Sequence, residues 1–548
     1  MRSGMWKALS FVAFTVGCGL LAASALGSVS QAPPPNTFRW SLSVDIDDVD
    51  PALASYEPTW ALTYATGAKL FNYPDAPAPR GSQLVPEIAA GFPRISRDGR
   101  TYTFHLKKTY RFSDGAPVTA RNFKSALYRV AHPRMSSPGY EFISDIVGAK
   151  AFNRRQTRSL SGIRTVGAHT LRIQLKKPRG DLLARLAMPF FAAVPTSLEI
   201  TPYGVRPPIP SAGPYYISEW TQNRRVILER NRFYRGLRPH RVRRILVDIG
   251  LPVETIKLNI DRGATDAGDI PPDAHAELGR RYGVRRRSPG RYFVNATNRL
   301  VYLAFNHDRG LFGGPTPRGN IALKRAINLA IDRRYLMLRF GAHGGTVTDQ
   351  LLTPTMAGFR DWELYPRRPK LAQARRMAAG NLRNAKGIFY CGNRAPQPAI
   401  CQGVVGQLSN IGLDMDIRLF PHAYTWPPRH RGEEYDMLIL VGVLNTGLSD
   451  PSVSFDGVHG ATIQPRDNVN FSFFSDPTFN RRIELARRLQ GDRRYAAFAA
   501  LDRDVMRAAA PIAPIGYVND GHYVSSRVGC YHHHPVYGWN FGAICLRR

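Results

Sequence analysis

The sequence is poor in acidic residues. Its 548 residues include 41 Asp and Glu against 75 Lys and Arg, which gives a formal net charge of +34. A surplus of this size favours attraction to an anionic surface of the cell envelope. The arginines are scattered, however, and short clusters such as Arg241–Arg244 come with no recognition-helix motif. We therefore expect no specific nucleic-acid partner, only a salt-screened attraction to anionic polymer or lipid.

Catalytic motifs are missing as well. The chain has no G-x-S-x-G, no H-E-x-x-H and no phosphate-binding loop. The run His532–His534 is the one cluster that suggests a metal, but consecutive side chains on a strand point to opposite faces. A polar surface loop is the favoured interpretation of this run, and a weak surface metal site is the alternative. We expect neither catalysis nor a cofactor.

Cysteine is scarce, with five residues. Apart from Cys18, they fall into two local pairs, Cys391 with Cys401 and Cys530 with Cys545. Neither pair has the short spacing of a zinc site. Four cysteines allow three connectivities, of which local pairing is the simplest. We expect two disulfides, which an exported protein can form.

The N-terminus indicates export. Arg2 and Lys7 precede the apolar run Ala8–Leu26, which small residues follow. This order predicts a secretory signal peptide over residues 1–31, cleaved after Ala25, after Gly27 or a few residues later. A lipid anchor at Cys18 is a less favoured alternative, because the apolar run continues past it; an uncleaved anchor is a third. The expected location is the periplasm or the outer face of the cytoplasmic membrane.

What the sequence does contain is an ordered set of local signals around Thr101–Arg129. Asp98-Gly99 predicts a tight hairpin turn. The alternation of Tyr102, Phe104 and Leu106 with polar residues predicts a half-buried strand. After a second turn, Thr119 is placed to cap an amphipathic helix. The apolar stripe of that helix has helical spacing and consists of Phe123, Ala126, Leu127 and Val130.

This stretch, DGRTYTFHLKKTYRFSDGAPVTARNFKSALYR, resembles the signature of the family 5 solute-binding proteins. These are the extracytoplasmic receptors of ABC importers for oligopeptides, dipeptides, nickel and related solutes. RAINLAIDR at residues 325–333 resembles another element of the family, and so does the Asn-ending strand Arg299–Asn306. The resemblance runs from about Phe38 to the C-terminus, with gaps at residues 200–210 and 264–290.

The resemblance implies an α/β protein with the two-lobed, periplasmic-binding-protein type II-like fold, an extra subdomain in the first lobe and a hinged cleft between the lobes. Residues 36–300 would form the first lobe with its subdomain, residues 301–510 the second lobe, and residues 511–548 the return to the first lobe. A length of 548 residues also exceeds what one ordinary core organises. Among the elements expected on this basis are helices over Tyr56–Asn72 and Ile321–Phe340.

The resemblance also points to ligand contacts in Val441–Phe455. In peptide-binding relatives this segment reads roughly W-x-x-D-x-x-DP, and its first Asp pairs with the peptide's α-ammonium. Here Asp450-Pro451 preserves the second half, whereas the first Asp position falls at Gly447, beside Asn445 and Thr446. A glycine supplies no charge for a desolvated cation. On this segment alone, solutes with hydroxyl, amide or anionic groups suit the cleft better than free-amine peptides. Asp450 has a structural alternative, as the cap of the following turn.

A second ligand-contact segment is implied after Asp50-Pro51. Tyr56, Thr59 and Trp60 stand where relatives present ligand contacts. Tyr56 and Trp60 lie one helical turn apart, so packing in the core is an equal alternative for them.

The function implied is that of a monomeric receptor. It would capture a peptide-like or other small polar solute between its lobes and deliver it to an ABC permease in the cytoplasmic membrane. Two alternatives stay open: a metal or metal-chelate receptor of the same family, and a secreted enzyme or envelope-polymer-associated protein on the same scaffold. Turnover of a bound solute would identify the enzyme.

Overall fold

The computed structural model describes residues 35–382, 385–421, 431–443, 448–466 and 468–547. The expected signal peptide therefore lies outside the described residues, as do Asn445, Thr446 and Gly447. The chain divides into two units, residues 1–35 and residues 36–548, and all that follows concerns the second. Among the described residues, no helix combines the length and the apolar character needed to cross a membrane.

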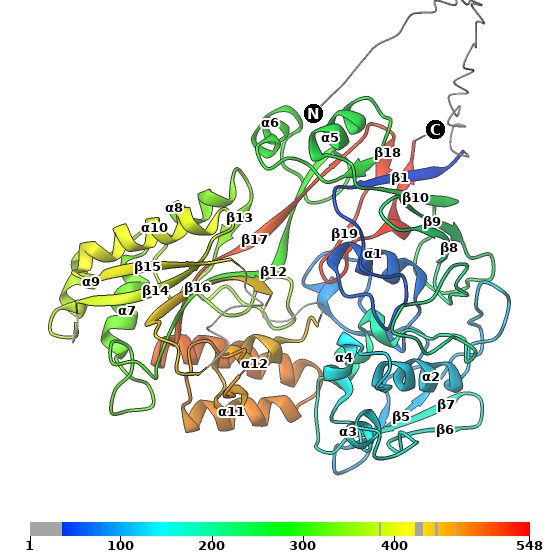
Figure 1. The fold of residues 1–548 in the computed structure, drawn as a ribbon, viewed down its shortest axis with the longest axis horizontal. Coiled ribbons are helices and arrows are strands. Elements are labelled where there is room, and N and C mark those ends of the chain that lie inside the picture. Colours follow the sequence, from blue (N-terminus) through cyan, green and yellow to red (C-terminus); the bar gives the residue numbers. More distant parts are fainter. Residues whose placement is uncertain (1–34, 383–384, 422–430, 444–447, 467, 548) are drawn as a thin grey trace, which may run out of the picture. The chain divides into compact units, whose positions relative to one another are not determined.

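One mixed sheet of eleven strands organises the described part of residues 36–548 (Figure 1). The strands follow the order β15 (Asp414–Phe420), β14 (Lys386–Gly392), β16 (Met437–Val443), β12 (Tyr292–Phe305), β17 (Ile512–Val524), β11 (Ala267–Gly268), β1 (Thr37–Leu42), β10 (Arg244–Ile249), β9 (Arg225–Arg230) and β8 (Tyr215–Thr221), and β13 (Gly345–Val347) pairs with β17 beside this path.

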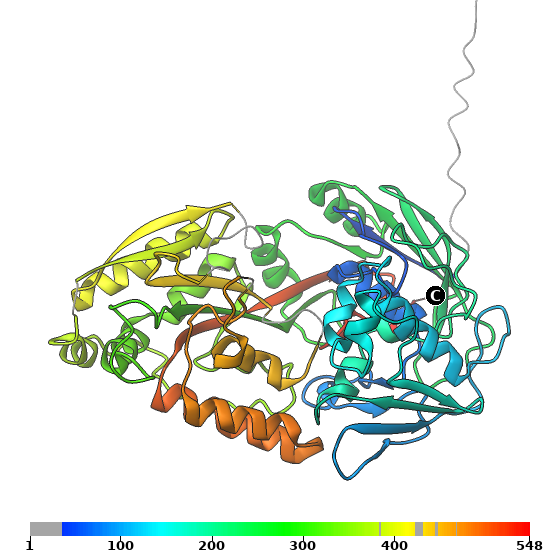
Figure 2. The same ribbon diagram turned by 60° about the horizontal axis from the view of Figure 1, so that its bottom comes forward.

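The two long strands at the centre, β12 and β17, belong to both halves of this sheet. They have 14 and 13 residues and pair antiparallel, from Tyr292 with Tyr523 to Ala304 with Ile512. One end of the pair continues into β11 and β1, and the other end into β16 and β14. Figures 1 and 2 show β17, in red, from two sides. Each half of the sheet is thus covalently linked to the other through these strands.

Four helices pack on the half of the sheet that contains β14 and β16. They are α7 (Ile321–Ala330), α8 (Arg333–Met337), α9 (Leu371–Ala378) and α10 (Gln397–Leu408), and their apolar faces share one core with those strands. The expected single helix over Ile321–Phe340 is wrong. Ile331 has extended backbone, and Asp332 caps the new helix α8 by accepting from the Tyr335 amide. An Asp at this point favours a fresh N-cap over helix continuation.

The half of the sheet that contains β1 and β10 carries α1 (Glu57–Thr66), α5 (Val253–Asp261) and α6 (Ala274–Tyr282). The expected helix over Tyr56–Asn72 is wrong at its end. It stops at Thr66, Gly67 is extended, and Phe71–Asn72 forms the short strand β2, which pairs with β3 (Val85–Pro86). Glycine favours helix termination, and here a Cβ at Gly67 would lie 2.8 Å from Ala192 Cβ.

A smaller antiparallel sheet lies in the region 94–174. Its order is β4 (Arg94–Ile95), β5 (Thr101–His105), β7 (Thr170–Gln174) and β6 (Ile163–Val166). The hairpin predicted at Asp98-Gly99 is confirmed, as Gly99 has a φ of 69° between β4 and β5. The helix predicted after Thr119 is α2 (Ala120–Ala131), where Thr119 and Asn122 form a capping box. Nearby are the short helices α3 (Ala149–Asn153) and α4 (Leu182–Leu186).

Helices α11 (Pro477–Arg488) and α12 (Gly491–Ala508) connect this region to the half of the large sheet that contains β14 and β16. They share one apolar core with α2 and the small sheet. At the contact, the Gly180 amide donates to the Arg487 carbonyl at 2.7 Å, and Gln490 Nε2 donates to the Tyr102 hydroxyl at 3.0 Å.

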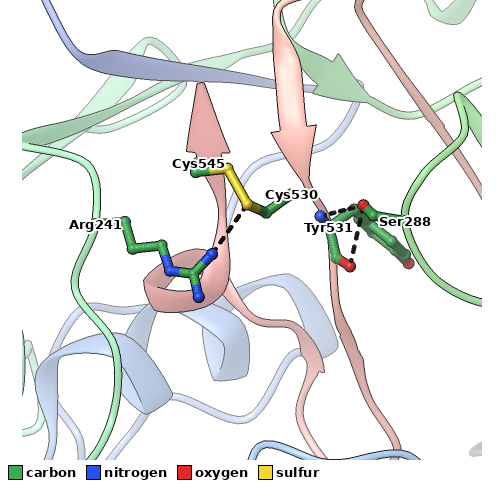
Figure 3. Close-up of a disulfide and its surroundings, with 5 residues drawn as sticks. All are labelled: Arg241, Ser288, Cys530, Tyr531 and Cys545. Atoms are coloured by element: carbon green, nitrogen blue, oxygen red, sulfur yellow. Dashed lines mark hydrogen bonds between the residues drawn. A yellow bond between two sulfur atoms is a disulfide. The ribbon is translucent and has the colours of Figure 1, made fainter. Parts of the chain in front are cut away.

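Both expected cysteine pairs are joined in the structure. Cys391 is linked to Cys401, and Cys530 to Cys545. The second disulfide connects β18 (Val528–Cys530) to β21 (Cys545–Leu546), with Arg241 Nη1 2.9 Å from the Cys530 sulfur (Figure 3). Between these strands lies the hairpin of β19 (His533–His534) and β20 (Gly538–Trp539). The disulfide thus closes a loop that folds back onto the half of the sheet that contains β1 and β10.

Candidate functional site

A cavity of about 490 Å³ lies where both central strands meet the start of α1. Its wall includes Arg299 of β12 and residues 519–522 of β17. Two larger hollows, of about 840 and 710 Å³, lie elsewhere, against α3 and α4 and between α8 and α10. The smaller cavity is the candidate site, because it is lined by β12 and β17, the two strands that both halves of the sheet share. The rest of its wall comes from β1, the loop after β11, α6 and the β20 region.

Two carboxylates face each other on this wall. Glu57 is the first residue of α1, and its side chain lies in hydrogen-bonding contact with that of Asp520 on β17. Asp520 is paired with Arg299 across the central strands. The charge of the adjacent Asp520 raises the pKa of Glu57 to about 7, although Arg299 opposes this shift. At neutral pH the cluster therefore alternates between zero net charge and one negative charge.

Glu57 itself has no cationic partner. Among the described residues, no Lys, Arg or His nitrogen lies within ion-pair distance of its carboxylate. The positive end of the α1 backbone dipole favours a carboxylate at this position, but it does not replace a counter-ion. An acceptor on the cavity wall is thus left open for a donor from outside the chain.

The other ionisable groups of the cavity are Asp269, His275 and His522. Asp269 accepts from the backbone and side chain of Ser43, at 2.8 and 2.7 Å. Burial lowers the pKa of His275, and it lowers the pKa of His522 to about 3, so both imidazoles are neutral at pH 7. The charged groups of the wall are then three carboxylates and one guanidinium, an excess of two negative charges when Glu57 is ionised.

Aromatic rings form a second part of the wall. Trp539 stacks on His522 with ring centroids 4.3 Å apart, and Trp40 lies 6.0 Å from Trp539. Trp40 is 2 % exposed, and its Nε1 has no hydrogen-bond acceptor among the described residues. A buried donor of this kind is normally satisfied, by water if not by protein. The cavity thus offers rings, an open carboxylate and an open donor.

The Cys530–Cys545 disulfide supports this aromatic wall. The Tyr531 amide, next to Cys530, donates to Ser288 Oγ at 2.7 Å (Figure 3). The hydroxyl of Tyr531 lies 2.5 Å from His522 Nδ1, and its ring stacks on Phe293. The disulfide, Tyr531 and His522 therefore form a continuous series of contacts that ends at Trp539.

The structure places Tyr56, Thr59 and Trp60 beside the cavity rather than on its wall. Tyr56 is the N-cap residue of α1 and is 58 % exposed. Thr59 is buried and donates to Asp47 at 2.6 Å. Trp60 packs edge-on against Phe190, and its Nε1 donates to the Ala54 carbonyl. The residues of α1 that line the cavity are Glu57, Pro58 and Ala61.

Asp450 is fully engaged within the protein. Its carboxylate accepts from Arg494 Nε at 2.9 Å and Nη2 at 2.6 Å, and also from the Ser452 amide and hydroxyl. It caps the 3₁₀ helix Pro451–Val458, which agrees with the structural alternative. The neighbouring candidates Asn445, Thr446 and Gly447 lie outside the described residues. The last residue of β16 before them, Val443, is the register partner of Arg299 in the cavity wall.

The interpretation of His532–His534 as a polar surface loop is wrong. His533 and His534 are buried in the β19–β20 hairpin, where the His534 ring packs against Tyr64 and Tyr537. Burial lowers the pKa of His533 to about 4 and holds that of His534 well below its usual value, so these imidazoles pack as neutral aromatic rings. Within the described ranges, no group of three His, Cys, Asp or Glu side chains is arranged to hold a metal ion.

The sequence analysis missed Glu57, Arg299 and Asp520. None of them belongs to a motif, and they come from three segments that only the sheet topology brings together. The one available signal was the scarcity of acidic residues.

Comparisons with known proteins agree with this architecture. The family model described as "Bacterial extracellular solute-binding proteins, family 5 Middle" matches residues 83–463. The periplasmic oligopeptide-binding protein OppA of Salmonella typhimurium is 22 % identical over 80 % of each chain. The periplasmic murein peptide-binding protein MppA of Escherichia coli is 27 % identical, but that match spans only about half of each chain, 46 %. Among solved structures, "Clavulanic acid biosynthesis oligopeptide binding protein 2" superimposes with a TM-score of 0.81 at 24 % identity, over 93 % of this chain and 95 % of the other.

Proposed function

Because this chain belongs to the family 5 bacterial extracellular solute-binding proteins, we propose that it is the solute-capturing receptor of an ABC importer. The α/β fold is the two-lobed fold of this family. The observation that carries the proposal for this chain is the position of its cavity. The cavity lies on β12 and β17, the strands through which the two halves of the sheet are joined. A solute bound there contacts the part of the molecule about which the halves rotate when such a protein closes.

In this proposal the lobes follow the expected boundaries. The first lobe comprises residues 36–300 with the small sheet as its subdomain, the second lobe residues 301–510, and residues 511–548 return to the first. The solute is a peptide-like or other small polar molecule. A cavity of about 490 Å³ falls within the usual range for small-molecule sites and has room for a solute of a few residues.

The partner is an ABC permease in the cytoplasmic membrane, to which the closed receptor delivers its solute. The receptor acts as a monomer outside that membrane. The net charge of +34 holds it near anionic envelope surfaces by screened attraction. Binding and release complete the cycle, and no covalent step on the solute is part of it.

The test begins with residues 36–548 purified from a bacterial periplasm. Native mass spectrometry should find one small solute bound per chain. Removing the solute by partial unfolding and refolding should increase the radius of gyration measured by small-angle X-ray scattering, and adding it back should reverse the change. The proposal would be contradicted if the bound molecule is converted into a product, or if the radius of gyration is the same with and without the solute.

A further inference from the structure

We propose that the carboxylate of Glu57 is the subsite for a cationic group of the solute, an ammonium or a guanidinium. This inference rests on the proposed function, since it names the class of solute that the cavity takes. It also revises the expectation from the segment around Gly447. The carboxylate that this segment lacks is supplied from another wall, by the first residue of α1.

The first argument is the unpaired state of Glu57. Glu57 is exposed on the cavity wall, so a solute can reach its carboxylate. The neighbouring Asp520 has such a partner in Arg299, whereas Glu57 has Asp520, another carboxylate, beside it. Two carboxylates in contact repel each other when both are ionised. A cation placed at Glu57 offsets this repulsion, because the two adjacent carboxylates then lie between two positive charges, the solute's and that of Arg299.

The second argument is the local reversal of charge. The chain as a whole has 34 more cationic than acidic side chains. The described residues of the cavity wall show the opposite balance, with Glu57, Asp269 and Asp520 against Arg299. Both His275 and His522 are neutral and do not offset the difference. A negative cavity in a strongly basic protein attracts cations at the one place where a solute is held.

The third argument is independent of charge. Trp40 and Trp539 present rings to the same cavity, and aromatic faces bind cations favourably. The indole Nε1 of Trp40 is buried without an acceptor among the described residues. A carbonyl or hydroxyl oxygen of the solute would satisfy it. The predicted solute therefore carries a cation and a nearby hydrogen-bond acceptor, as an amino amide or a basic peptide does.

The pH dependence of binding follows from the groups that face Glu57. These are Asp520, His522 and Arg299 on the central strands, with Asp269 and His275 on the rest of the wall. Since Glu57 has a pKa of about 7, its ionised fraction rises about tenfold between pH 6 and pH 8. Affinity for a solute with a fixed positive charge should rise by about the same factor. At pH 7, binding should release about half a proton from Glu57.

The experiment compares two tripeptides that differ in one charge. N-acetyl-Ala-Arg-Ala-amide carries only a guanidinium, and N-acetyl-Ala-citrulline-Ala-amide is its neutral counterpart of nearly equal shape. A second pair is Ala-Ala-Ala-amide and its N-acetyl form, studied at pH 6 and pH 7, where the α-amine stays protonated. Isothermal titration in two buffers with different ionisation enthalpies gives both the affinity and the number of protons released.

We expect the wild-type protein to bind the charged member of at least one pair ten times more tightly than the neutral member. Glu57→Gln should lower the affinity for the charged member at least tenfold, abolish the proton release, and leave the affinity for the neutral member unchanged. Glu254→Gln is the control, because it removes one exposed carboxylate on α5 next to the cavity. It should alter neither quantity.

The inference is overturned if neither charged peptide is preferred, or if Glu57→Gln preserves the preference. Binding of neutral or anionic solutes alone would overturn it while leaving the receptor function intact. If no peptide binds, the inference also falls, and the solute carried by the periplasmic protein then decides the receptor function separately.

Discussion

Arg494 and Asp450 form a buried ion pair with two hydrogen bonds between the guanidinium and the carboxylate. The side chains are 2 % and 4 % exposed. The third guanidinium nitrogen, Nη1, donates to the carbonyls of Ala486 and Arg487. The pair thus connects the start of α12 to the 3₁₀ helix after residue 450 and to the end of α11.

Removing one member of this pair should destabilise the protein strongly. Arg494→Met or Asp450→Asn should each lower the free energy of unfolding by about 3–5 kcal/mol, because the remaining group stays buried without its partner. The double variant should lose less than the sum of the two. Urea unfolding measures all three. Arg367→Met, at the exposed pair with Glu363, is the control and should change little; strictly additive losses at 450 and 494 would argue against coupling.

The two disulfides should have separable effects. Replacing Cys530 and Cys545 by Ser should cost about 3 kcal/mol of stability and also weaken solute binding, since Tyr531 and His522 lose their support. Replacing Cys391 and Cys401 should cost a similar amount, about 2–3 kcal/mol, without affecting affinity, because neither β14 nor α10, which carry these residues, lines the cavity. Non-reducing peptide mapping establishes the pairing first, and thiols found free at these four positions would contradict it.

Lys69 should make stability depend on pH. Its Nζ is buried 3.9 Å from Glu87 Oε2, above the rings of Tyr64 and Tyr537, and burial lowers its pKa to about 7. Between pH 7 and about 10.4 the unfolded chain binds a proton that the folded chain does not, so stability rises with pH across this window. Below pH 7 the cost of charging Lys69 is fully present.

Lys69→Met should therefore raise the free energy of unfolding at pH 6, by on the order of 1–3 kcal/mol, and flatten its rise above pH 7. Chemical denaturation at a series of pH values is the measurement. Lys124→Met, at an exposed position of α2, should leave the pH dependence unchanged. A destabilised Lys69→Met variant would mean that the lysine is paired more favourably than its burial implies.

The exported protein should begin shortly after the apolar N-terminal run. Intact mass and N-terminal sequencing of protein from the periplasm should locate the first residue after Ala25, after Gly27 or a few residues later. Cys18→Ser should not alter its release from membranes. If that substitution converts a membrane-bound protein into a free one, a lipid anchor at Cys18 is the correct interpretation.

The positive charge should produce only salt-sensitive attraction to polyanions. Sedimentation with phosphatidylglycerol vesicles should be strong at 50 mM salt and nearly absent at 500 mM, since screened contacts weaken steeply. Vesicles of neutral phosphatidylcholine serve as the control. Retention of one DNA sequence over others at high salt would contradict this expectation.

Local signals in the sequence predicted local structure well. The turn at Asp98-Gly99 and the capping box of Thr119 depend on residues within a few positions of one another, and both are confirmed. The single helix predicted over Ile321–Phe340 is wrong, because Asp332, inside the apolar stripe, caps a new helix. The family resemblance supplied the topology that no local signal contains.

The site was harder to predict because its residues are not neighbours in the chain. Glu57 and Asp520 meet only after β17 has returned beside β1 through β11. The histidine run was misread for a related reason, since whether His533 faces water is decided by the aromatic residues against which its hairpin packs. For Asp450 the sequence left a ligand contact and a structural cap open, and its pairing with Arg494 depends on a residue 44 positions away.

The register of β12 against β17 shifts between Ala296 and Leu300 and again at Val301–Tyr302. Arg299 lies inside this irregular interval, and its ion-pair partner Asp520 is the register partner of Asn295, just before the interval. Strands bend and twist most readily where a ladder is interrupted. In the proposed receptor the two halves of the sheet rotate about this interval, and the ion pair beside the cavity lies at that axis. A rotation of a few degrees at this axis grows with distance from it, so the outermost strands β8 and β15 travel furthest.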